Sequence, residues 1–311
     1  MVKILVTGGA GFIGSCIAEK LAENKENYLV VVDNLLTGHR SKIPVSKHSN
    51  IKFIKADVNN LHEISSIFNA YAFDYVFHYA ALVGVKRTLD NPVMVLNDIN
   101  GINNILLLSK NTGVKRVFYS SSSEVYGEPV EFPQNEYTTP LNSRLPYAIV
   151  KNVGEAYYRS FKLEYDLDYT IFRFFNTYGP KQSIDFVMSK FISCALKNET
   201  ITIYGNGSQT RTFCYIDDNI EACVNAFYNN LLINDVANIG NDVETTILDL
   251  AQTIIRLTGS KSGIVHLPAL ADGDMTRRKP DISKMKQLLK RNLLPLEDGI
   301  KIVLKNNSFI S

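Results

Sequence analysis

A tyrosine and a lysine, Tyr147 and Lys151, stand four residues apart in a stretch with helical spacing. On a helix this spacing places both side chains on one face. A lysine ammonium near a phenol favours the phenolate and lowers the pKa of the phenol toward neutrality. Such a tyrosine can take a proton from a sugar hydroxyl while hydride leaves the same carbon. Ser122, after an expected strand, adds a hydroxyl that can bond to the reacting oxygen.

Hydride transfer requires an acceptor, and the first turn of the chain fits one. Gly8, Gly11 and Gly14 follow GxxGxxG spacing, and Gly9, Gly11 and Gly14 follow GxGxxG, between an apolar run and a helical pattern. Glycines there permit a tight turn, a close approach of backbone to a pyrophosphate, and close packing of helix on strand. The positive N-terminus of the helix then faces the phosphates.

Asp33 ends the second apolar run, about 20 residues beyond Gly14, where dinucleotide sites place an acid. A carboxylate there accepts hydrogen bonds from the adenosine ribose hydroxyls and repels a 2′-phosphate, so NAD is the expected cofactor rather than NADP. Arg40 lies nearby and would soften that preference. Asp57, after the third run, is a candidate for the adenine edge, and an ordinary loop aspartate explains it equally well.

Short apolar runs alternate with helical patterns through the first half of the chain. Strands are expected at residues 2–7, 29–33, 51–56, 75–78, 116–120 and 169–174. Helices are expected from residue 12, from Asn91-Pro92 to about Gly113, and from Pro146 to about Tyr165. This order indicates right-handed βαβ units, and therefore a Rossmann-type, doubly wound α/β fold with a parallel sheet.

The rhythm changes after Asn176, where turn-rich motifs replace the regular alternation. We therefore expect an NAD-binding domain at residues 1–176 and a smaller substrate-binding lobe at 177–311. The segment near 213–238 is expected to return to the first domain. A chain of 311 residues suits this division into one large α/β domain and a coupled lobe.

Composition narrows the function further. The net charge is +2 and no charge run dominates, which disfavours nucleic acid and membrane surfaces as partners. No apolar stretch reaches the length of a membrane helix, and the N-terminal run is too short for a signal peptide. The four cysteines are scattered and form no metal-binding pattern, so no metal is expected. Free thiols suit a reducing compartment, and a cytoplasmic location is expected.

Longer motifs carry a resemblance to a known family, the extended short-chain dehydrogenases/reductases that modify nucleotide sugars. The resemblance covers nearly the whole chain. The motifs are TGGAGFIG (7–14), DNLLTG (33–38), HYAA (78–81), SSSSEVYG (120–127), YAIVK (147–151), RFFNTYGP (173–180), YGNGSQTRTFCYIDD (204–218) and RRKPDISKM (277–285).

The resemblance implies roles for individual residues. Ser122, Tyr147 and Lys151 match the family's catalytic residues, and Ser123 and Glu124 follow them as further catalytic candidates. Asn176, Arg211 and Arg278 match residues that bind the nucleotide-sugar substrate, and a planar guanidinium suits a diphosphate. The expected NAD contacts are Gly8, Gly11, Phe12, Ile13, Gly14, Asp33, Asn34, Asp57, Val58, Ala80, Ala81, Tyr147 and Lys151. The family also implies a homodimer formed through helices near 92–110 and 146–165.

These enzymes all begin by oxidising the sugar C4 hydroxyl to a ketone, and they diverge afterwards. Ser123-Glu124 resembles the pair in UDP-glucuronate decarboxylases, and Arg278 matches an arginine that faces the sugar there; a phosphate ligand is the other interpretation of Arg278. A decarboxylase-like activity is the leading expectation. The alternatives are a 4-epimerase, a C4 dehydrogenase that releases a 4-keto sugar, a 4,6-dehydratase and, from another class, a non-catalytic NAD-sensing protein.

Overall fold

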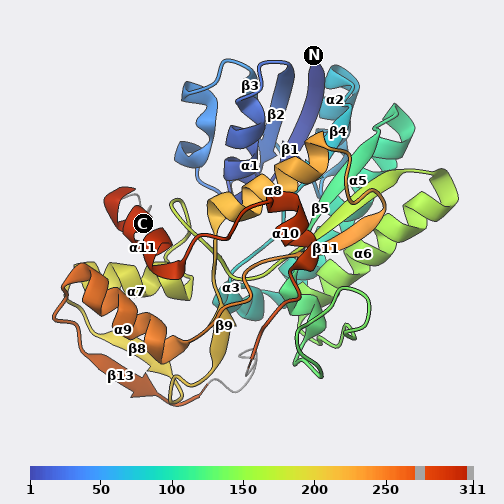
Figure 1. Ribbon diagram of the computed structural model, residues 1–311. Coiled ribbons are helices and arrows are strands. Elements are labelled where there is room, and N and C mark those ends of the chain that lie inside the picture. The colour runs from blue at the N-terminus through green and yellow to red at the C-terminus, as the bar shows by residue number, and fades with distance from the viewer. Residues whose placement is uncertain (270–276, 307–311) are drawn as a thin grey trace. The chain divides into compact units, whose positions relative to one another are not determined.

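Seven strands form the large sheet of the protein, in the order β11-β6-β5-β4-β1-β2-β3 (Figure 1). Strand β1 pairs with β2 and with β4, β2 pairs with β3, and β4 pairs with β5. All four of these pairings are parallel. Their central residues are fully buried, as in Ile4–Val6 and Leu29–Val32, which explains the uninterrupted apolar runs. The strands are β1 (Val2–Thr7), β2 (Asn27–Asp33), β3 (Ile51–Lys55), β4 (Tyr75–His78), β5 (Arg116–Ser122), β6 (Asp168–Phe174) and β11 (Asp235–Ile239). The expected Rossmann-type fold is confirmed.

Helices cover both faces of this sheet (Figure 1). On one face α5 packs between α2 and α6, and their apolar residues share one core with the strands. On the other face lie α1 and α8, where Phe227 of α8 meets the rings of Phe77 and Phe118 edge-on. The helices are α1 (Phe12–Ala22), α2 (Leu61–Tyr71), α3 (Val85–Asp90), α4 (Pro92–Leu96), α5 (Asp98–Thr112), α6 (Pro146–Tyr165) and α8 (Ile216–Tyr228).

The single helix expected from Asn91-Pro92 to Gly113 is two helices, α4 and α5, separated by Asn97. Asn97 keeps helical dihedral angles, but its carbonyl accepts the Asn100 amide, a tighter three-residue turn. Helix α5 ends where Gly113 takes a left-handed conformation, and α6 begins with Pro146 in its first turn.

The structure is a computed structural model that describes residues 1–269 and 277–306, and these form two compact units. Unit 1 contains Met1–Val125, Ser143–Arg173 and Ala222–Ala237. Unit 2 contains Tyr126–Asn142, Phe174–Glu221 and the chain from Asn238 onward. Compared with the boundary expected at residue 176, unit 2 also takes in Tyr126–Asn142, and Ala222–Ala237 returns to unit 1.

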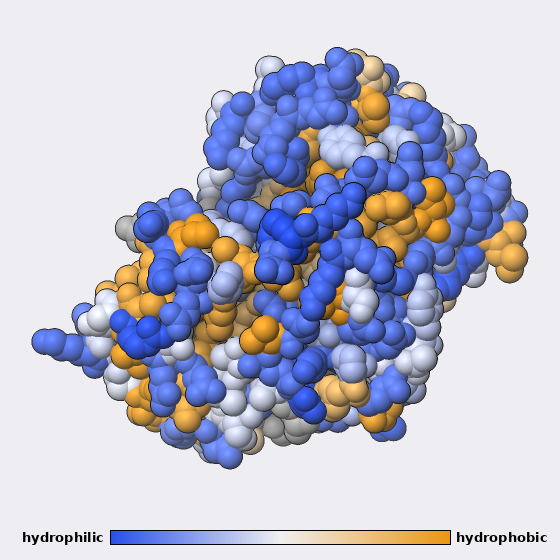
Figure 2. All heavy atoms as spheres, in the orientation of Figure 1, coloured by the Kyte–Doolittle hydropathy of each residue, from blue (hydrophilic) through white to orange (hydrophobic). Residues whose placement is uncertain are grey.

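Unit 2 is built from short paired strands and helices. Strand β7 pairs with β10, β9 with β12, and β8 with β13. Apolar side chains gather over β8 and β13 (Figure 2), where Tyr204, Val265 and Leu267 are partly exposed. The elements are β7 (Thr177–Tyr178), α7 (Val187–Leu196), β8 (Ile201–Tyr204), β9 (Thr210–Thr212), β10 (Cys214–Tyr215), β12 (Glu244–Thr246), α9 (Ile247–Thr258), β13 (Ile264–Leu267), α10 (Ser283–Leu289) and α11 (Leu296–Asn306).

Across residues 1–269 and 277–306, no helix is both long enough and apolar enough to cross a bilayer. The same residues hold no group of three or more histidine, cysteine, aspartate or glutamate side chains placed to bind a metal ion.

Candidate active site

The glycine-rich turn after β1 lies against the loop after β4. Gly8 has φ of +68°, and a Cβ there would lie 2.6 Å from the Ala80 nitrogen. A Cβ on Gly14 would lie 2.2 Å from the Gly8 carbonyl oxygen, so α1 approaches the turn as only glycine permits. Gly11, the N-cap of α1, has no side chain to cover the first turn. The amides in the first turn of α1 are therefore not bonded by a capping side chain, which suits a diphosphate at this helix N-terminus.

This turn lies at the point where the strand order reverses, because β1 has β2 on one side and β4 on the other. The Thr7 hydroxyl oxygen accepts the amides of Tyr79 and Ala80, both at 3.2 Å, and lies 2.8 Å from His78 Nδ1. Open α/β sheets bind ligands beside such a reversal, beyond the carboxyl ends of the strands.

Asp33 ends β2 as a buried carboxylate fixed by the glycine-rich turn after β1 and by its own loop. Oδ2 accepts the Ala10 amide at 2.9 Å and Oδ1 accepts the Leu35 amide at 2.8 Å. Burial raises the pKa of Asp33, and the two amides and Lys42 oppose that rise. Each carboxylate oxygen accepts more than one hydrogen bond, so both can also accept ribose hydroxyls.

The remaining expected NAD contacts surround the same edge of the sheet. Asn34 donates to Asp57 Oδ2 at 3.2 Å, which joins the loops after β2 and β3. Phe12 and Ile13 begin α1, Val58 is buried in the core, and Ala80 and Ala81 follow β4, half-buried. Because the glycine cradle and the acid at the end of β2 occur together, the residues of unit 1 fit NAD.

Lys151 is the buried member of the pair on α6. Its Nζ donates to the Ser120 carbonyl at 2.6 Å and lies 5.7 Å from the centre of the Tyr147 ring. Burial lowers the pKa of Lys151 to about 8, and the negative charge of Asp98 opposes that fall. Tyr147 packs half-buried against the core. The predicted pair thus shares one helix face, with the ammonium beneath the ring.

Ser122 is the last residue of β5 and is buried. Its Oγ accepts the Glu124 amide at 3.2 Å, and a 3₁₀ turn from Ser123 to Tyr126 follows. Ser123 is buried and Glu124 is half-buried. The Lys151 ammonium bonds to the Ser120 carbonyl, two residues before Ser122, and this bond joins α6 to β5. All five catalytic candidates belong to unit 1.

Asp98, the first residue of α5, is a site residue that sequence reasoning missed. Its carboxylate accepts the Leu82 amide at 2.7 Å and the Asn59 side chain at 3.3 Å, which links the loops after β4 and β3. Burial raises its pKa, and these bonds and the charge of Lys151 oppose the rise. The sequence signal for Asp98 was an acidic residue at the first position of a helix. It was hidden because one continuous helix was expected from Asn91-Pro92 to about Gly113.

The three substrate-binding candidates all belong to unit 2. The side-chain nitrogen of Asn176 is buried without a hydrogen-bond partner among the described residues. Arg211 lies on β9, buried, with Nη1 donating to the Thr210 carbonyl at 2.7 Å. Arg278 is buried as well. An unsatisfied buried donor is costly, so Asn176 suits an acceptor on a ligand.

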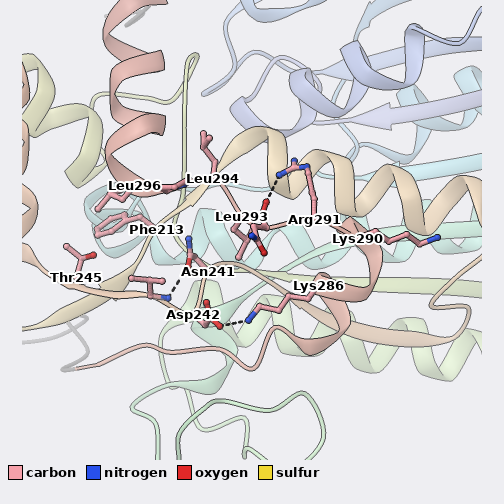
Figure 3. Close-up of a pocket in the computed structure, with 13 residues that line it drawn as sticks. Phe213, Asn241, Asp242, Thr245, Lys286, Lys290, Arg291, Leu293, Leu294 and Leu296 are labelled. Atoms are coloured by element: carbon pink, nitrogen blue, oxygen red, sulfur yellow. Dashed lines mark hydrogen bonds and ion pairs between the residues drawn. The ribbon is translucent and has the colours of Figure 1, made fainter.

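A separate pocket of about 620 Å³ lies within unit 2. It is formed by the chain after β11, by α10 and by the segment Arg291–Leu296 (Figure 3). None of the predicted site residues lines it. Lys286 bonds to Asp242 at 2.7 Å and Arg291 to Asp218 at 2.7 Å, so two of its basic side chains are already paired.

A dinucleotide cradle at the strand reversal, an acid at the end of β2 and a buried lysine beneath a tyrosine define a short-chain oxidoreductase. Comparison with known proteins agrees. The family described as "NAD dependent epimerase/dehydratase family" matches residues 4–240. The chain belongs to this family: it is an NAD-dependent enzyme of the extended short-chain type that acts on nucleotide sugars.

Three relatives illustrate the range of reactions. UDP-glucuronic acid decarboxylase 1 of Danio rerio is 36% identical over 307 residues, 96% of this chain and 71% of that protein. UDP-glucose 4-epimerase of Thermotoga maritima, solved with UDP-glucose, superposes with a TM-score of 0.91 at 33% identity, covering 98% of both chains. UDP-glucuronic acid 4-epimerase of Bacillus cereus, solved with UDP-glucuronic acid and NAD, gives 0.88 at 30% identity, also covering 98% of both chains.

Proposed function

We propose that the protein oxidises C4 of UDP-glucuronic acid and then decarboxylates the resulting 4-keto sugar. The observation that carries the oxidation is the buried Lys151, which bonds to Ser120 and lies beneath the Tyr147 ring. The uridine nucleotide and the acidic sugar are supported by the similarity to the decarboxylase of Danio rerio and the epimerase of Bacillus cereus.

In the oxidation, the Tyr147 phenolate takes the proton of the C4 hydroxyl, with Lys151 holding the phenolate charge. Ser122 donates a hydrogen bond to the same oxygen and fixes its position. Bound NAD+ would supply the acceptor for the hydride of C4. Gly8, Gly11 and Gly14 leave room for its diphosphate, and Asp33 accepts its ribose hydroxyls.

The 4-keto product is a β-keto acid, because the carboxylate on C5 is two carbons from the new carbonyl. The bond from C5 to the carboxylate breaks, CO2 leaves, and the electron pair passes to the C4 oxygen as an enolate. The hydroxyl of Tyr147, protonated in the first step, donates a hydrogen bond to that oxygen. Glu124 is the candidate donor of the proton that C5 then gains, which completes the 4-keto pentose.

Unit 2 supplies the substrate-binding residues in this proposal. Arg211 binds the diphosphate, for which a planar guanidinium is suited, and Asn176 donates to an oxygen of the same group. Arg278 binds the sugar carboxylate. A homodimer and a cytoplasmic location also belong to the proposal; partly exposed Val93, Met94 and Leu96 on α4 support the former, and the four free cysteines the latter.

Epimerisation at C4 is the second candidate, because the structure of the Bacillus cereus enzyme that matches this chain is named for that reaction. The two reactions differ after C4 oxidation: an epimerase returns hydride to the opposite face of C4, and the carboxylate stays.

Product masses separate these reactions. Purified protein is incubated with NAD+ and UDP-glucuronic acid, and products are read by mass spectrometry. Decarboxylation releases CO2 and leaves a UDP-pentose or its 4-keto form. A product isomer of unchanged mass would show epimerisation instead. Loss of two hydrogens alone would show simple dehydrogenation, and loss of water would show dehydration; each of these results overturns the proposal. UDP-glucose and UDP-N-acetylglucosamine are incubated with the protein in parallel. If the protein converts only these two, the assignment of an acidic sugar as substrate is wrong.

A further inference from the structure

Glu155 is a fully buried carboxylate on α6 whose acceptor positions are filled by four hydrogen bonds. Arg173 of β6 binds it in a bidentate manner, with Nε to Oε1 at 2.8 Å and Nη2 to Oε2 at 2.7 Å. The Ser121 hydroxyl of β5 donates to Oε1 at 2.7 Å, and Arg159 donates to Oε2 at 3.0 Å. One side chain thus joins α6 to two neighbouring strands.

This cluster continues the helix face that carries the catalytic pair. Tyr147, Lys151 and Glu155 follow one another at four-residue intervals, so they form one row along α6. The row rests on consecutive residues of β5: Lys151 bonds to the Ser120 carbonyl and Glu155 to the Ser121 hydroxyl. Ser122 comes next on the strand.

Helix and strand also fit closely beside these bonds. A Cβ on Gly154 would lie 2.2 Å from the hydroxyl oxygen of Tyr119. Tyr119, Ser120 and Ser121 therefore each contact α6, at Gly154, Lys151 and Glu155 in turn. Two of the three contacts are polar and directional, and they fix how far α6 can slide along β5.

Stability alone is a poor reason for an ion pair in this place. Glu155 and Arg173 are 0% and 1% exposed, and removing two charges from water offsets most of their attraction. Burial by itself raises the pKa of Glu155, and the hydrogen bonds and charge of Arg173 bring it below its ordinary value. Apolar side chains of the same size would bury this interface equally well, but they would tolerate sliding that a bidentate pair does not.

We propose that Glu155, held by Ser121 and Arg173, is a positioning residue that sets the register of α6 on β5, and so holds Tyr147 and Lys151 in their working positions beside Ser122. The assignment rests on the proposed function for the roles of those three residues. In this role Glu155 acts through Tyr147 and Lys151 and does not touch substrate or cofactor.

The hydrogen bonds of Lys151 to Ser120 and of Glu155 to Ser121 determine where the catalytic pair lies. Without the Ser121–Glu155 bond, α6 is held on β5 by one directional contact fewer, and the position of the Lys151 ammonium beneath Tyr147 loosens. The charged and titratable groups that face Lys151 are Asp98 from α5, His78 from β4, Tyr119 from β5 and Tyr147 on its own helix. A displacement of about 1 Å in such a site lowers turnover on the order of a hundredfold.

The test compares Ser121→Ala with Ser189→Ala. Both serines are buried and each donates one hydrogen bond to a side chain, at 2.7 Å to Glu155 and at 2.8 Å to Gln182. Arg173→Lys is the second variant, because it keeps the charge and loses the bidentate geometry. The full chain is labelled with ¹³C at the tyrosine ring carbon that bears the hydroxyl, and the Tyr147 signal is the one absent from Tyr147→Phe.

The primary measurement is the pH at which Tyr147 ionises with NAD+ present. We expect a higher value than in wild type for Ser121→Ala and Arg173→Lys and an unchanged value for Ser189→Ala, with a similar loss of thermal stability in both serine variants. Ionisation of Tyr147 at the wild-type pH in Ser121→Ala and Arg173→Lys overturns the proposal and leaves Glu155 a purely structural residue.

Turnover of UDP-glucuronic acid is the second measurement. We expect kcat to fall about tenfold or more in Ser121→Ala with KM nearly unchanged, since only the reacting groups move. If wild type converts no nucleotide sugar while Tyr147 still ionises at a higher pH in Ser121→Ala, the positioning role stands and the proposed reaction falls.

Discussion

Replacing Lys151 with methionine is expected to abolish activity and at the same time make the protein more stable near neutral pH. Burial lowers the pKa of Lys151 from 10.5 to about 8, a difference that corresponds to about 3 kcal/mol of folding free energy against the buried ammonium. Methionine removes that cost. It also leaves the Ser120 carbonyl without its donor, which costs about 1–3 kcal/mol, so the net gain near pH 7 is about 1 kcal/mol.

The pH dependence gives the sharper test. Because the folded pKa of Lys151 lies below its unfolded value, the unfolded chain binds the proton more strongly between about pH 8 and 10.5. Wild-type stability, relative to the variant, therefore rises with pH through that window. Between about pH 7 and about pH 9.5, the free energy of unfolding of Lys151→Met should fall by roughly 2 kcal/mol relative to that of wild type.

Urea unfolding of both proteins at the two pH values measures this change. Lys190→Met, at an exposed position on α7, serves as the control and should leave the difference from wild type nearly independent of pH. A stability difference between wild type and Lys151→Met that stays constant from pH 7 to pH 9.5 would refute the reasoning, because the buried ammonium would then not be its source.

Three further predictions concern the site. Asp33→Ala should weaken NAD binding and narrow its advantage over NADP in fluorescence titrations; native preference for NADP would contradict the assignment. Tyr147→Phe should lower turnover by a factor on the order of 10² or more while the protein still folds and binds NAD, and near-normal activity would remove Tyr147 from the mechanism. Glu124→Gln should retain C4 oxidation, read as NADH absorbance, and slow formation of the 4-keto pentose protonated at C5; an unchanged rate of that product would exclude Glu124 as the proton donor.

The parts of the fold that the sequence predicted are those governed by local pattern. Buried parallel strands are apolar on both faces, so the runs at 2–7 and 75–78 coincide with β1 and β4. The glycine spacing reports a backbone conformation that other residues cannot adopt, and Pro146 marks a helix start through its fixed φ. Each signal is carried by adjacent residues, and none depends on distant contacts.

The parts that escaped prediction depend on tertiary contacts. Glu155 stands in a polar stretch of α6 that resembles a solvent-facing helix, and only the packing of Ser121 and Arg173 shows that it is buried. Asp98 gains its place from loops 16 and 39 residues away in the sequence. The transfer of Tyr126–Asn142 to unit 2 is likewise invisible locally, since that segment contacts residues such as Asn238 and Asp281 far along the chain.

The return of Ala222–Ala237 to unit 1 governs the order in which the chain can fold during synthesis. Strand β11 borders β6 in the large sheet, but the ribosome makes it about 60 residues later, after a long segment of unit 2. Until then β6 is an open strand edge, and the face that α8 covers exposes Phe77 and Phe118. A nascent chain at this stage presents both an unpaired edge and an apolar surface, the two features that recruit chaperones and promote aggregation. Placing the closing strand late in the sequence thus makes the first unit depend on synthesis of much of the second.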